Sequence, residues 1–203
     1  RGKSSGWKLN TLLINMRNTI QKLESIFRQM VENYSTMGES WKNLTLGREA
    51  FNLMLSLPDT FPGEYDTPAD KADLLGQMLD RIIETEAPRF CISVREEMQR
   101  LNPSDSENEH SLAMLHDYIN PAISMEDFCK CHRRHLKFDP VERTEEYEKL
   151  IPYVESEISK ELKDHPRGMG FCFAYWSAKR AAFARRGIDW KSPAFMNPGV
   201  MFD

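Results

Sequence analysis

Thiol and imidazole side chains are concentrated in one short stretch, which runs from Phe128 to His135. The stretch holds Cys129, Cys131, His132 and His135, and thiolate and imidazole groups are ligands that zinc favours in proteins. In a helix, Cys131 and His135 would lie one turn apart on one stripe, and Cys129 and His132 on another. The spacing matches none of the usual zinc signatures, and a tetrahedral site needs a further ligand. Two interpretations follow: a zinc-stabilised fold or small metal-dependent enzyme, and a helix whose Cys131 packs inside while its histidines lie on a basic surface.

Basic side chains gather in two predicted helices, over residues 130–137 and 179–191. Several such charges on one face could contact nucleic-acid phosphates or an acidic protein surface. The acidic segment 61–127, with five basic and fifteen acidic residues, is a competing partner within the same chain. The overall charge of −4 does not favour a nucleic-acid-binding protein as a whole. The candidate interaction residues are Lys130, Arg133, Arg134, Lys179, Arg180, Arg185, Arg186 and Trp190.

No catalytic signature accompanies these clusters. The sequence contains no nucleophile elbow, no His-Glu-x-x-His, no phosphate loop and no dinucleotide fingerprint. Four cysteines are too few for a disulfide-built fold, so we expect reduced thiols and a cytoplasmic location. No run of 18 apolar residues exists, and we therefore expect no membrane span. An enzyme is the less favoured class, and zinc is the one cofactor that the sequence suggests.

The strongest periodic signal predicts a long helix near residues 9–36. Its apolar residues alternate at gaps of three and four, which is a heptad pattern. Further apolar residues beside this seam widen the stripe, which favours packing inside a bundle over an exposed dimeric coiled coil, although both stay open. The seam residues are Leu9, Leu13, Met16, Ile20, Leu23, Phe27, Met30 and Tyr34.

The remaining signals also indicate helices. Thr67 followed by Pro68 is typical of a helix start, and Gly187 follows the last clear helix as a typical stop. No segment alternates with the period of a strand. We therefore predict an all-α, irregular bundle of about six to eight helices with a long N-terminal helix and a packed, non-helical C-terminal tail. Residues 1–203 would form a single domain, with loop 58–67 as a possible hinge.

Most of these patterns indicate side chains that pack in a core, and none is a catalytic signature. The predicted function is therefore a protein–protein interaction or scaffold module, possibly self-associating, with a protein partner or a second copy as its ligand. The alternatives are a nucleic-acid-associated helical protein and the metal-dependent protein described above. The C-terminal tail has two interpretations as well: a strap over its own bundle, or a peptide that docks on a partner through Trp190.

Overall fold

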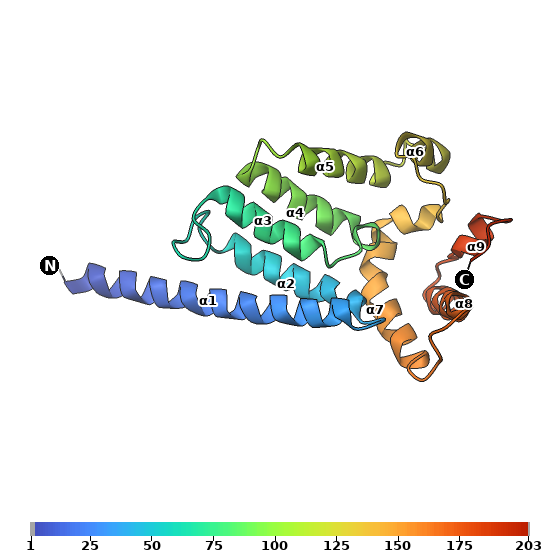
Figure 1. Cartoon of the computed structure of the whole chain (residues 1–203), viewed down its shortest axis with the longest axis horizontal. Helices are drawn as coiled ribbons and strands as arrows, with labels where there is room; N and C mark the ends of the chain where they lie inside the picture. Colours follow the sequence, from blue (N-terminus) through green and yellow to red (C-terminus); the bar gives the residue numbers. More distant parts are fainter. Residues whose placement is uncertain (1–2, 203) are drawn as a thin grey trace. The chain divides into compact units, whose positions relative to one another are not determined.

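A computed structural model describes residues 3–202, with side chains from residue 13 onward. In this part of the chain 67% of the residues are helical, nine α-helices are present, and there are no strands. The predicted all-α, multi-helix fold is thus confirmed (Figure 1). The chain divides into two compact units, the first ending at Ile82 and the second beginning at Ile83. Loop 58–67 lies within the first unit, and the single-domain organisation remains a prediction.

The first unit consists of long helix α1 and the helices that pack beside it. Figure 1 shows α1, α2 and α3 lying side by side. A single isolated bridge joins Phe61 and Tyr65 in the loop between α2 and α3. The elements are α1 (Lys3–Ser35), the 3-10 helix η1 (Ser40–Lys42), α2 (Asn43–Leu55) and α3 (Pro68–Leu79).

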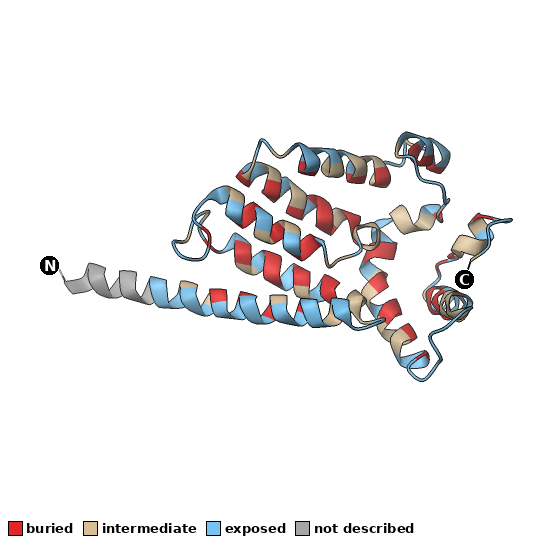
Figure 2. Ribbon diagram, in the orientation of Figure 1, coloured by how far each residue is buried: buried red, intermediate tan, exposed pale blue. Residues whose placement is uncertain are grey.

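The heptad stripe of α1 packs inside its own chain over its central turns. Ile20, Leu23 and Met30 are buried, and Figure 2 shows the buried residues of α1 on the side toward α2. The stripe loses this cover at both ends, because Leu13 is 43% exposed and Tyr34 is 61% exposed. The side chain of Leu9, which the heptad pattern also includes, lies outside the described residues.

Local capping explains where α3 begins. Thr67 and Asp70 form a capping box: the Thr67 hydroxyl accepts from the Asp70 N–H at 3.2 Å, and the Asp70 carboxylate accepts from the Thr67 N–H at 2.7 Å. These hydrogen bonds hold the pKa of Asp70 below its usual value.

Buried Asn43 connects segments of the first unit, since its amide donates to the Met30 carbonyl at 2.9 Å and to the Arg81 carbonyl at 3.1 Å.

The second unit contains six α-helices and two 3-10 helices among its described residues. Helices α4 and α5 form a pair, and α7 packs against α8. The elements are η2 (Glu84–Glu86), α4 (Pro88–Leu101), α5 (Ser106–Ile119), α6 (Met125–Cys131), η3 (Pro140–Arg143), α7 (Glu145–Glu161), α8 (Phe171–Ala184) and α9 (Pro193–Met196).

Two charged side chains fix helix ends in the second unit. The buried carboxylate of Glu148 accepts from the backbone N–H groups of Arg89 and Phe90, at 3.1 Å and 3.0 Å, at the start of α4. The guanidinium of Arg143 donates to the Asp117 and Asn120 carbonyls, at 3.1 Å and 2.7 Å, at the end of α5. Each charge therefore lies at the helix end whose dipole it complements.

The C-terminal tail is packed along its own unit. Asn197 bonds to the backbone of Lys137 in both directions, accepting from its N–H and donating to its carbonyl, each at 2.8 Å. The Lys191 N–H donates to the buried Asp139 carboxylate at 2.6 Å. These bonds fasten part of the tail to its own unit, whereas the apolar side chains of Phe195, Val200 and Met201, which were expected to pack, are 66%, 46% and 94% exposed. Within the described residues of the tail, the one helical turn of α9 is the only departure from irregular backbone. In this structure the tail is a strap.

Candidate functional site

The cysteine–histidine stretch is less helical than the sequence analysis assumed. Helix α6 ends at Cys131, because Arg133 adopts a left-handed conformation with φ of 50°. The Arg134 N–H then donates to the Cys129 carbonyl at 2.8 Å, which closes a Schellman-type cap. Cys131 and His135 therefore do not share one helical stripe.

The four candidate zinc ligands have separate surroundings. Cys129 is buried, and its thiol lies 3.8 Å from the Leu136 carbonyl, whereas Cys131 and His135 are exposed. The imidazole of His132 lies 3.0 Å from the Asp117 carboxylate. No three histidine, cysteine, aspartate or glutamate side chains come together as a metal-holding group anywhere in residues 13–202.

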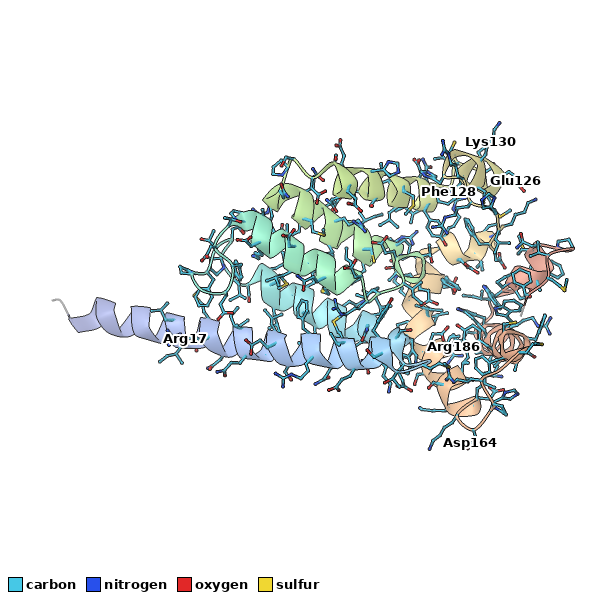
Figure 3. All side chains as sticks on the ribbon, in the orientation of Figure 1. Arg17, Glu126, Phe128, Lys130, Asp164 and Arg186 are labelled. Carbon is cyan, nitrogen blue, oxygen red and sulfur yellow. The ribbon has the colours of Figure 1, made fainter. Side chains whose placement is uncertain are left out.

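The two basic clusters contain exposed side chains on different helices. Lys130, Arg133 and Arg134 are exposed at the end of α6, and Arg180 is exposed on α8. Figure 3 shows Lys130 and Arg186 at separate places on the second unit.

The basic residues at the end of α8 have an acidic partner. Arg186 lies 2.8 Å from the Glu157 carboxylate, and Arg185 pairs with the same group. The hydrogen bonds from Arg186 and Arg185 hold the pKa of Glu157 below its usual value. Nucleic-acid binding remains a prediction, for which Lys130, Arg133, Arg134 and Arg180 are exposed, as is Arg185 beside its acidic partner.

Lys179, by contrast, lies inside the second unit. Its ammonium is 3.0 Å from Glu155, 3.5 Å from Glu86 and 3.2 Å from the Tyr175 hydroxyl. Burial alone would lower the pKa of Lys179, but the surrounding groups, Tyr147 and Tyr175 together with Glu86 and Glu155, raise it well above its usual value. Lys179 is therefore a buried cation in a carboxylate and aromatic shell, and it contributes no charge to the surface.

Trp190, which belongs to the C-terminal tail, packs against Lys179. Its ring lies 5.6 Å from the Lys179 ammonium, and its indole N–H donates to Glu142 at 2.7 Å. Burial raises the pKa of Glu142 despite the hydrogen bond from Trp190. Because Trp190 is only 2% exposed, it anchors the strap to its own unit, and the docking-peptide interpretation does not describe this structure.

An open apolar pocket lies in the first unit, where α1, the end of α2, the following loop and α3 meet. Its volume is about 250 Å³. Phe27 and Leu74 in its lining are half-buried, and the exposed carboxylate of Glu24 stands at its rim. The lining residues are Ile20, Leu23, Glu24, Phe27, Met54, Leu57, Glu64, Tyr65, Lys71 and Leu74.

The wall of this pocket is held by two buried polar side chains. The ammonium of Lys71 donates to the Leu57 carbonyl at 3.0 Å and to the Pro58 carbonyl at 3.3 Å, and it lies 3.6 Å from Asp59. The Tyr65 hydroxyl donates to the Pro58 carbonyl at 2.9 Å. The Lys71 bonds fasten the loop after α2 to α3, and the Tyr65 bond joins two parts of that loop. The polar ends are thus satisfied, and the hydrocarbon parts of both side chains line the pocket.

A polar hollow of about 430 Å³ adjoins the apolar pocket, because Glu64, Tyr65 and Leu74 line both. Its lining is acidic, and the carboxylates there are exposed. Lys71 is the one cationic residue in the described lining of either hollow, and its ammonium is buried. The carboxylates of the two linings are Glu24, Glu64, Asp66, Asp70 and Asp73.

Sequence reasoning did not identify this site as a site. The stripe through Ile20, Leu23 and Phe27 was expected to pack inside the bundle or in a dimeric coiled coil, and nothing singled out Tyr65 or Lys71. A lysine on the apolar face of a predicted helix was the available signal, since lysine is rarely buried without partners. The location of the pocket itself depends on how three helices meet, which local spacing does not specify.

No helix among the described residues is long and apolar enough to cross a membrane. Comparison of the chain with protein-family models, with curated proteins and with solved structures finds no match.

Proposed function

We propose that the chain is a protein-interaction module that binds an amphipathic helix of a partner protein at the apolar pocket of its first unit. One observation carries the proposal: the apolar stripe of α1 runs through the pocket and continues beyond it to Leu13, which the described residues leave 43% exposed. Ile20, Leu23 and Phe27 line the pocket, and the next residue of the stripe toward the N-terminus, Met16, is half-buried.

The size of the pocket favours side chains over a small molecule. At about 250 Å³ it falls below the range of roughly 300–1,000 Å³ typical of small-molecule sites. A helix laid in a groove instead inserts a few apolar anchors at spacings of three and four residues. One or two anchors would enter the pocket, and the next would cover the stripe toward Leu13.

The test uses a peptide of about 18 residues, or roughly five helical turns, with leucine at gaps of three and four and glutamine elsewhere. Binding is measured by calorimetry on the full chain. Leu74→Trp fills the pocket and should weaken binding by about tenfold or more, equivalent to about 1.4 kcal/mol. Leu13→Asp should weaken it less, because Leu13 lies outside the pocket.

The matched control is Leu55→Asp, which places the same charge at a similarly exposed leucine that does not line the pocket. It should leave the affinity unchanged, and circular dichroism should show the same helix content for all variants. Absence of binding by the wild-type chain, or equal losses for Leu55→Asp and Leu74→Trp, would contradict the proposal. A concentration-dependent dimer that Leu13→Asp dissociates would show that the occupant is a second copy instead.

A further inference from the structure

The carboxylates around the pocket indicate which charge its occupant should carry. Glu24 of α1 and Glu64 of the loop line the apolar pocket, and Asp73 of α3 lines the adjoining hollow, so three elements contribute negative charge here. All three are exposed. Asp66 and Asp70 add two further carboxylates to the adjoining hollow.

The described linings of the pocket and the hollow contain no exposed cationic side chain that would offset these negative charges. The ammonium of Lys71 is held by backbone carbonyls and by Asp59, and it is 1% exposed. Charges of one sign beside a low-dielectric wall concentrate the field at the mouth of a cleft, and complementary charges then speed association and select the partner.

We infer that the partner helix is basic: an amphipathic helix whose apolar face enters the pocket and whose flanking lysine or arginine side chains meet Glu24, Glu64 and Asp73. This inference rests on the proposed function and narrows it. An anionic or carboxylate-bearing occupant would bring like charges together at the rim, which is unfavourable. The long stems of lysine and arginine also suit the site, because they cover apolar surface while their charged ends reach the rim.

The experiment compares three peptides that share one leucine pattern and differ elsewhere: glutamine, lysine or glutamate fills the remaining positions. At low ionic strength the lysine peptide should bind about ten- to a hundredfold more tightly than the glutamate peptide. The ratio should fall as salt is raised, because the rim is exposed and therefore screened. Equal affinities of the lysine and glutamate peptides, with the glutamine peptide still sensitive to Leu74→Trp, would overturn the basic partner and leave the pocket function standing.

A charge-reversal variant locates the effect. Glu24→Lys combined with Glu64→Lys should invert the preference, so that the glutamate peptide binds more tightly. Asp70 is left unchanged, because it belongs to the capping box of α3. The control is Glu32→Lys with Asp80→Lys, which makes the same change in net charge at exposed positions outside both linings. An equal inversion in this control would assign the preference to overall charge and would overturn the inference.

Discussion

Lys71 in the first unit and Lys179 in the second are both buried, at 1% and 5% exposure, yet the groups around them differ. Lys71 bonds to backbone carbonyls beside an open pocket, whereas Lys179 lies among carboxylates, a tyrosine hydroxyl and aromatic rings. In the first unit the cation fixes a wall and leaves the neighbouring carboxylates exposed. In the second unit the cation pairs directly with two carboxylates, Glu86 and Glu155. Each buried lysine therefore connects separate segments of its unit. Exposed carboxylates and an open pocket lie beside Lys71 only, and they make that region the candidate binding surface.

The largest expected effect is the loss of the Lys179 charge. Lys179→Met should lower the free energy of unfolding by about 3–5 kcal/mol at neutral pH, because the buried carboxylate of Glu155 and the partly buried carboxylate of Glu86 would lose their cation. Chemical denaturation measures the change. The exposed neighbour Arg180 provides the control, and Arg180→Met should stay within about 0.5 kcal/mol of the wild type. A loss below about 1 kcal/mol for Lys179→Met would contradict the assignment of Lys179 as the centre of this network.

A smaller loss is expected at the other buried lysine. Lys71→Met keeps an apolar side chain in the pocket wall but removes the donor to the Leu57 and Pro58 carbonyls, at a cost of about 1–3 kcal/mol. Lys22→Met, which removes an exposed ion pair with Glu49, should cost no more than about 1 kcal/mol. If Lys71→Met were costlier than Lys179→Met under the same conditions, the contrast between the two surroundings would be wrong.

Glu142 gives the smallest effect and one that depends on pH. Burial raises its pKa, so the ionised carboxylate lowers stability at neutral pH, and this cost disappears as pH falls through the raised pKa toward the unfolded value near 4.5. Glu142→Gln keeps an acceptor for Trp190 and should raise the free energy of unfolding by about 1 kcal/mol or less at pH 7. The gain should vanish near pH 4. A gain that grew toward acid would contradict the direction of the pKa shift.

The parts of this structure that local sequence determines were predictable. The spacing of Ile20, Leu23 and Met30 predicts the buried side of α1, and Thr67 and Gly187 predict a helix start and a helix end. In each case the determining groups lie within a few residues of one another, so the pattern can be read without knowing the fold.

Features that depend on distant contacts or on an unusual conformation were not predictable. The ion pair of Lys179 with Glu86 joins groups 93 positions apart, and no local pattern distinguishes Lys179 from exposed Arg180. The early end of α6 depends on a left-handed Arg133, a conformation that glycine usually supplies. The candidate site likewise exists only where α1, α2 and α3 meet, and Lys71 on the apolar face of a predicted helix was its local signal.

The most direct test of the helix-docking pocket is nuclear magnetic resonance of the isotope-labelled full chain during titration with the leucine–lysine peptide. Methyl signals of Ile20, Leu23, Met54 and Leu74 should shift together, and those of the second unit should stay in place. Shifts confined to residues outside the pocket, or unchanged methyl signals at saturating peptide, would contradict the central claim.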